Sequence, residues 1–170
     1  LEGVLDPSWS DEDAQAVDLV SGLQVRQPKR ARSGFFVDAR GTVVTALEAV
    51  QTCTRITLDE VTEASVRMID DALGVAVLEP QSPIAPRAVA EFSSTAPRLQ
   101  SDVAVSGFSY GGLLGAPTMS FGALAELSGL RGEAELTRLE VETLEGDVGG
   151  PVFDQSGAVL GMLLPRTDGT

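Results

Sequence analysis

The stretch that decides the fold is residues 145–162, EGDVGGPVFDQSGAVLGM. Its first half places glycines and a proline around one central valine, Val148, a composition typical of a tight loop that folds around a single exposed side chain. Its second half belongs to segment 150–164, which reads as short strands joined by a turn. The stretch therefore predicts a glycine loop that leads into a β-hairpin, with a chemically inert side chain at the centre of the loop.

Most of the remaining chain also has the pattern of short strands between turns. Residues 34–47 predict a hairpin with its turn at 38–41, and residues 73–80 predict an apolar strand closed by Pro80. Further strands are expected at 23–27, 55–60, 63–70, 101–112, 116–127 and 137–143. Short strands at this spacing favour an all-β fold of barrels or a sandwich over a parallel α/β sheet.

The chain divides into two halves of similar size at the segment 81–100, which is rich in proline and serine. Before the first half, Ser10 can cap a short helix and Asp13 can return the bond. We therefore expect the following parts: a lead-in with a short helix over 1–21, a first β-barrel over 22–85, a linker over 86–100 and a second β-barrel over 101–170.

Composition excludes several classes of function. The 170 residues include 12 basic and 25 acidic side chains, and the net charge of −13 argues against a nucleic-acid partner and against anionic membrane surfaces. No apolar run is long enough to span a membrane. The sequence contains no histidine, which excludes histidine-dependent catalysis and histidine-ligated metals. We expect neither a metal nor a cofactor.

The first residue and the single cysteine lead to two smaller expectations. Because the sequence begins at Leu1 rather than methionine, we expect a processed or trimmed chain that can lack an upstream targeting segment. Cys53 has no second cysteine to pair with, so it cannot form an internal disulfide. We interpret it as a small buried residue at the start of a strand.

Three segments in chain order resemble the trypsin-like peptidases, especially the bacterial HtrA/Deg type. They are SGFFVDARGTVVTALEAV (33–50), DDALGVAVLEP (70–80) and EGDVGGPVFDQSGAVLGM (145–162). The resemblance covers residues 22–165. It implies an all-β fold of two six-stranded Greek-key β-barrels, the chymotrypsin fold, preceded here by the short N-terminal helix.

The resemblance also assigns the catalytic positions of the family to three residues that lack the expected chemistry. The histidine position falls on Glu48, the aspartate position on Gly74 and the serine position on Val148. Acyl transfer needs an oxygen or sulfur nucleophile, and a valine carries only methyl groups. We therefore expect a catalytically inactive pseudopeptidase that acts as a binding or scaffold module.

Binding can survive the loss of the nucleophile. The N–H groups of Gly146 and Val148 can still point at one spot if Gly146, Asp147 and their neighbours keep the loop geometry. In the family, the strand corresponding to 163–166 pairs with an extended peptide by β-augmentation. The expected binding residues are Gly146, Asp147, Val148, Leu164, Pro165 and Arg166, and the expected partner is a protein or an extended peptide.

The resemblance carries two further expectations. The chain stops soon after residues 163–166, where the family continues into a further strand and a helix. The family also points to a periplasmic or extracellular location.

Two alternatives remain open at this point. In one, Glu48 acts with Asp70 or Asp71 as an unorthodox carboxylate-dependent peptidase, whereas the simpler interpretation is that both aspartates cap a turn and that Glu48 faces solvent. In the other, the chain is a structural module of a larger cell-envelope protein. Burial of Glu48 and Val148 against neighbouring side chains favours that module, and an open groove beside Val148 favours binding.

Overall fold

The computed structural model describes residues 30–166. The chain divides into two compact units, Leu1–Arg30 and Ala31–Thr170, and nearly all described residues belong to the second. The helix expected after Ser10 and the strand expected at 23–27 lie outside the described residues.

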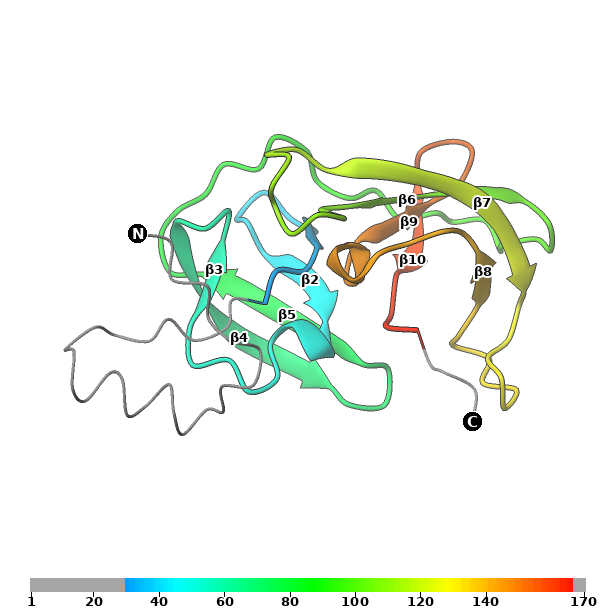
Figure 1. Ribbon diagram of the computed structural model, residues 1–170, viewed down its shortest axis with the longest axis horizontal. Helices are drawn as coiled ribbons and strands as arrows, with labels where there is room; N and C mark the ends of the chain where they lie inside the picture. Colours follow the sequence, from blue (N-terminus) through cyan, green and yellow to red (C-terminus); the bar gives the residue numbers. More distant parts are fainter. Residues whose placement is uncertain (1–29, 167–170) are drawn as a thin grey trace, which may run out of the picture. The chain divides into compact units, whose positions relative to one another are not determined.

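The first half of the second unit forms a curled antiparallel sheet with the strand order β1-β2-β5-β4-β3 (Figure 1). Its elements are β1 (Gly34–Phe36), β2 (Val43–Ala46), the 3-10 turn η1 (Leu47–Ala49), β3 (Ile56–Leu58), β4 (Thr62–Asp70) and β5 (Val75–Pro80). Residues alternate between the two faces of a strand, which puts Ala76 and Leu78 of β5 in the core. As predicted, β5 ends at Pro80, which cannot donate to a strand ladder.

The second half forms another antiparallel sheet with the order β10-β9-β6-β7-β8. Its elements are β6 (Asp102–Gly107), β7 (Thr118–Glu126), β8 (Arg138–Glu140), the 3-10 turn η2 (Glu145–Asp147), β9 (Pro151–Phe153) and β10 (Val159–Met162). Strands β6 to β8 follow one another as neighbours, and β9 returns to lie beside β6. This order is the Greek key, which the resemblance predicts.

The number of strands differs from the expectation. Six were expected in each barrel, whereas each described sheet has five strands and so keeps two edge strands. In the first sheet, the remaining predicted strand falls at 23–27, outside the described residues. In the second sheet, β8 and β10 are the edges, and no strand among residues 30–166 joins them.

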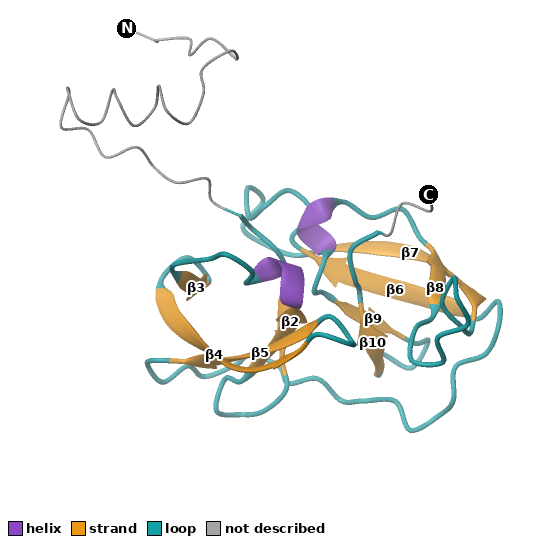
Figure 2. Ribbon diagram, turned by 90° about the horizontal axis from the view of Figure 1, so that it is seen from below, coloured by secondary structure: helices purple, strands orange, loops and turns teal. Residues whose placement is uncertain are grey.

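Each sheet has its own apolar core. The core of the first sheet consists of Val43, Leu47, Val50, Ala64, Ala76 and Leu78. The core of the second consists of Val103, Val105, Leu124 and Val152, with Leu139, Val141, Leu160 and Leu163 partly buried against it. Figure 2 shows the two 3-10 turns in the region where the sheets meet. That region is where the loop 145–150 lies.

The predicted turn of the first hairpin is confirmed, and the reason is the Asp38 carboxylate. It accepts hydrogen bonds from the backbone N–H groups of Arg40 and Thr42 and from the Thr42 hydroxyl. These bonds, above all the one from the Thr42 hydroxyl, hold the pKa of Asp38 well below its usual range. The aspartate and Gly41 (φ 88) together specify this turn.

The interpretation of Cys53 as a buried residue is wrong. Its side chain is exposed, in the turn between η1 and β3. The thiol lies 3.5 Å from the carbonyl oxygen of Ala49. Strand β3 begins only at Ile56, so Cys53 comes before the sheet and is not part of it.

Candidate functional site

The structure brings the three expected catalytic positions onto adjoining segments. The Leu47 N–H, beside Glu48, donates to the Gly74 carbonyl at 2.8 Å. The Val148 carbonyl accepts a bond of 2.9 Å from the Ser33 N–H. Ser33 in turn accepts at its carbonyl oxygen from the Thr45 hydroxyl, three residues before Glu48, at 2.6 Å. The chain therefore assembles the framework of the site, whatever side chains occupy it.

Glycine is required at the centre of the loop because the backbone passes so close to its neighbours. Gly149 has φ 87, and a β-carbon on it would lie 2.2 Å from the Ser33 carbonyl oxygen. A β-carbon on Gly150 would lie 2.1 Å from the Ser106 carbonyl oxygen. The sequence pattern GDVGGP is thus explained by packing and by left-handed backbone. Neither reason depends on a nucleophile at Val148.

Ser33 ties the loop to both halves of the chain. Its side chain is 4% exposed, and its hydroxyl donates to the Gly146 carbonyl at 2.6 Å. The same oxygen accepts from the Phe108 N–H at 2.8 Å. One buried hydroxyl therefore satisfies two backbone groups of the second half from a position just before β1.

Asp147 has a structural role in the loop. Its side chain is 2% exposed and accepts bonds from the Ser109 hydroxyl at 2.6 Å and from the Leu144 N–H at 2.8 Å. Ser109 also contacts Thr118, whose hydroxyl donates to the Gly107 carbonyl. The carboxylate of Asp147 faces inward and holds η2, so it does not line the surface where a ligand would lie.

The expectation of an exposed side chain at the centre of the loop is wrong, because Val148 is buried, with 7% of its surface exposed. Its N–H donates to the Glu145 carbonyl at 3.2 Å. That bond closes the turn η2 and turns the donor inward. The expected convergence of the Gly146 and Val148 N–H groups on a ligand is therefore not the arrangement in this structure, in which a carbonyl of the loop takes the Val148 donor.

Glu48 is held by Arg32. The guanidinium Nε donates to one carboxylate oxygen at 2.9 Å and Nη2 to the other at 2.7 Å, the bidentate geometry that suits arginine. Nη2 also reaches Glu145 at 3.4 Å. The hydrogen bond to Glu48 raises the pKa of Arg32 above its usual value. The Glu48 side chain is 31% exposed, and it lies in this ion pair rather than facing solvent freely.

Gly74 and Asp70 have local roles. Gly74 has φ 67, and a β-carbon there would meet the Leu164 side chain at 3.6 Å. The Asp70 carboxylate accepts from the Leu73 N–H at 3.0 Å, which confirms the prediction that it caps a turn. The left-handed backbone suits glycine at the position where the resemblance puts an aspartate.

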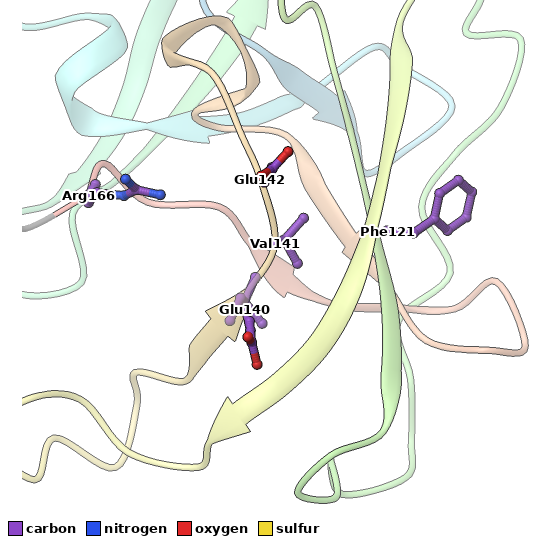
Figure 3. Close-up of a pocket in the computed structure, with 6 residues that line it drawn as sticks. Phe121, Glu140, Val141, Glu142 and Arg166 are labelled. Atoms are coloured by element: carbon purple, nitrogen blue, oxygen red, sulfur yellow. The ribbon is translucent and has the colours of Figure 1, made fainter.

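A groove of about 360 Å³ lies on the second sheet. Its lining residues are Phe121, Leu139, Glu140, Val141, Glu142 and Arg166. Figure 3 shows Arg166 on one side of the groove and residues 140–142 on the other, while the Phe121 ring points away from them. Among the six expected binding residues, Arg166 is the one that lines this groove.

The backbone beside the groove is unpaired within the described part of the chain. Residues 141–143, which continue β8, form no backbone hydrogen bonds with residues 30–166. The same holds for residues 164–166, which continue β10. Leu163, one residue earlier, has both groups paired, with the Gly149 N–H and the Gly150 carbonyl. Two unpaired edges therefore flank the groove, and such edges accept an added strand.

Sequence reasoning missed the residues that support the site. No role in the site was predicted for Arg32, Ser33 or Ser109. Their partners Glu48, Gly146 and Asp147 lie 16, 113 and 38 residues away. No local pattern signals such pairs.

Within residues 30–166, no helix is long and apolar enough to cross a membrane. In the same range, His, Cys, Asp and Glu do not gather into a group of three that could hold a metal ion.

Comparisons with known proteins agree with this architecture. The crystal structure of the serine endoprotease from Yersinia pestis matches with a TM-score of 0.66 and 19% sequence identity. The match covers 81% of this chain and 50% of the endoprotease chain, so this chain spans about half the length of that protein. At this identity the likeness concerns the fold alone.

No protein among those with curated descriptions matches the chain. The family model described as "Trypsin-like peptidase domain" matches residues 32–162, more than half of the sequence. This range includes both sheets, the loop 145–150 and the three expected catalytic positions. The chain belongs to the trypsin-like peptidase domain family.

Proposed function

We propose that this chain is a catalytically inactive trypsin-like domain that binds an extended peptide or a segment of a partner protein. The observation that carries the proposal is the unpaired backbone of residues 164–166 beside the groove lined by Arg166. An extended peptide can add to such an edge through main-chain hydrogen bonds, which need no nucleophile. Leu164, Pro165 and Arg166 are the proposed contacts, and Pro165 contributes only its carbonyl.

The proposed inactivity rests on the residues at the three catalytic positions. Val148 has no proton to transfer and no lone pair to attack with, and Gly74 has no side chain to orient a base. The chain has no histidine that could act from elsewhere. The Val148 N–H, which would polarise a substrate carbonyl, is bonded to Glu145. The chain therefore lacks the nucleophile, the histidine base, the side chain that orients this base and a free Val148 N–H, all of which acyl transfer uses in the family.

A carboxylate-dependent hydrolase has less support. Such a mechanism needs Glu48 to accept a proton from water, yet both of its oxygens accept hydrogen bonds from Arg32. Its suggested partner Asp70 accepts from the Leu73 N–H. Activity from this pair would be lost in Glu48→Gln, and it would be seen between about pH 3 and 8, where carboxylates titrate.

A purely architectural role is the second candidate, and the burial of Val148 favours it. With 7% of its surface exposed, Val148 is buried at the position where the family has its nucleophile. We therefore place peptide binding at the groove beside residues 164–166 and not at the loop. The two candidates differ in one measurable property, which is affinity for an extended peptide.

The test combines a binding assay with an activity assay on the purified chain. The protein is expected to leave casein intact, to resist a serine-reactive fluorophosphonate probe and to bind members of a library of randomised extended decapeptides. Turnover or stoichiometric labelling that copurifies with the protein would overturn the inactivity. A library without a single binder at micromolar concentration would overturn the binding role and leave the architectural one.

The proposed location is the periplasm or the extracellular space. It is supported by the family alone, and fractionation of the source cells with an antibody to this chain tests it. Recovery in the cytoplasmic fraction would contradict it.

A further inference from the structure

We propose that residues 31–33 form a latch over the loop 145–150, and that the ion pair between Arg32 and Glu48 is the part of this latch that can be released. The inference goes beyond the proposed function, because the groove assigned to a peptide has other lining residues. It is carried by the bonds that fix residues 31–33 to the loop and to both 3-10 turns, and by their unequal exposure to solvent.

The latch is bonded to the loop through Ser33. The Ser33 N–H donates to the Val148 carbonyl at 2.9 Å, and the Ser33 hydroxyl donates to the Gly146 carbonyl at 2.6 Å. The Ser33 carbonyl oxygen lies so close to Gly149 that a β-carbon there would not fit. Val148 is buried. A molecule in solvent therefore reaches the Val148 side chain only when the packing around it opens.

Arg32 joins the latch to both 3-10 turns. Its guanidinium holds Glu48 of η1 through hydrogen bonds of 2.9 and 2.7 Å, and it reaches Glu145 of η2 at 3.4 Å. Both turns lie in the region where the two sheets meet (Figure 2). Since η1 follows β2 of the first sheet and η2 precedes β9 of the second, one side chain spans the two halves of the chain.

The bonds of Ser33 and those of Arg32 differ in how readily solvent can replace them. Ser33 is buried, and so are its bonds to Gly146 and Thr45. The ion pair lies nearer the surface, with the side chains of Arg32 and Glu48 15% and 31% exposed. Dissolved ions screen partly exposed charges more than buried ones. We therefore assign the release of the latch to the ion pair.

Opening of the latch has a defined cost. It breaks the two hydrogen bonds between Arg32 and Glu48, and bonds between ionised groups are stronger than those between neutral groups. The closed state is therefore favoured while the pair is intact. Loss of either charge should raise the fraction of molecules in which position 148 is open.

The experiment measures how fast a thiol at position 148 reacts with a soluble thiol reagent at about 0.15 M salt. The probe is Val148→Cys in a Cys53→Ser background, which removes the exposed native thiol. Val105→Cys, in the buried core of the second sheet, is the reference for global unfolding. We expect the thiol at position 148 to react at least about tenfold faster than the thiol at position 105. Its rate should also depend less on urea, because local opening exposes less surface than unfolding.

The variants test which charges hold the latch. Arg32→Gln and, separately, Glu48→Gln are expected to raise the rate at position 148 about tenfold, since each breaks the pair. Glu145→Gln removes a 3.4 Å contact of a side chain that is 89% exposed, and it should change the rate less than about twofold. The matched control Arg55→Gln, which breaks an exposed pair with Glu63, should change it as little.

Hydrogen exchange provides the same test without an added cysteine. The Ser33 N–H bonds the Val148 carbonyl, so it is expected to exchange when the latch leaves the loop. Its exchange should be about tenfold faster in Glu48→Gln, and raising the salt to about 1 M should speed it in the parent chain more than in this variant.

Three results would overturn the latch. Equal thiol rates at positions 148 and 105 would show that the site opens only by global unfolding. Unchanged rates in both Arg32→Gln and Glu48→Gln would show that the ion pair does not hold the segment. An acceleration by Arg55→Gln as large as that by Arg32→Gln would show a general effect of charge or stability. Peptide binding at the groove stands or falls separately from these results.

Discussion

The loop 145–150 and the groove walls 141–143 and 164–166 belong to the same half of the chain but differ in how their polar groups are satisfied. In the loop, the backbone lies so close to neighbouring carbonyl oxygens that a β-carbon on Gly149 or Gly150 would not fit, and the supporting Ser33 hydroxyl and Asp147 carboxylate are each bonded twice. In the groove walls, the backbone has no partner within the described residues. The loop is therefore fixed by buried bonds and close packing, whereas the groove walls keep backbone groups that are unpaired among the described residues.

The largest effect is expected for Gly149→Ala, which breaks the loop. The new β-carbon would meet the Ser33 carbonyl oxygen and the left-handed backbone would be strained, at a combined cost of about 3–5 kcal/mol in the free energy of unfolding. Urea denaturation measures it. The matched control is Gly157→Ala, where φ is 83 but nothing lies within 4 Å, and only about 1–2 kcal/mol should be lost. Equal losses would show that close packing in the loop is unimportant.

The second prediction tests whether the loop can still adopt a catalytic geometry. The variant restores the catalytic residues with Glu48→His, Gly74→Asp and Val148→Ser. We expect no fluorophosphonate labelling, because position 148 is buried and its N–H is engaged by Glu145. The triple variant should lose about 2–4 kcal/mol, from strain at the left-handed position 74 and from lost apolar burial at 148. Stoichiometric labelling would mean that the loop can still open into a catalytic geometry.

The link between the loop and the first half of the chain is tested by Ser33→Ala. The substitution leaves the Gly146 carbonyl and the Phe108 N–H without their partner, and the free energy of unfolding should fall by about 2–3 kcal/mol. Ser156→Ala removes a hydroxyl that bonds Asp154 at an exposed turn, so its cost should stay under about 1 kcal/mol. A smaller loss at Ser33 than at Ser156 would contradict the assigned role of Ser33.

The smallest effect on stability is expected in the groove wall. Glu140→Gln with Glu142→Gln removes charges that have no ion-pair partner among residues 30–166, so the free energy of unfolding should change by no more than about 0.5 kcal/mol. Thermal unfolding without peptide measures it. A loss comparable to that of Ser33→Ala would mean that these side chains stabilise the fold, and the contrast with the loop would disappear.

Several local features were predictable because their cause lies within a few residues. The apolar run closed by Pro80 predicted strand β5, and Asp38 with Gly41 specified the first turn. The interpretation of Cys53 was wrong because a strand that begins a few residues later left it outside the sheet. The interpretation in which Glu48 faces solvent did not predict its ion pair with Arg32, because two residues that lie 16 positions apart share no local sequence pattern.

By itself, the sequence determined the all-β class, the glycine loop and the absence of a nucleophile at Val148, since alternation, backbone freedom and side-chain chemistry are properties of residues and of short segments. Only the tertiary structure decided that Val148 is buried, that Arg32 holds Glu48 and that a groove with unpaired edges lies beside Arg166. The Ser33–Gly146 bond joins residues 113 apart. Contacts at such separations depend on how the sheets fold and pack, and therefore exist only once the fold has formed.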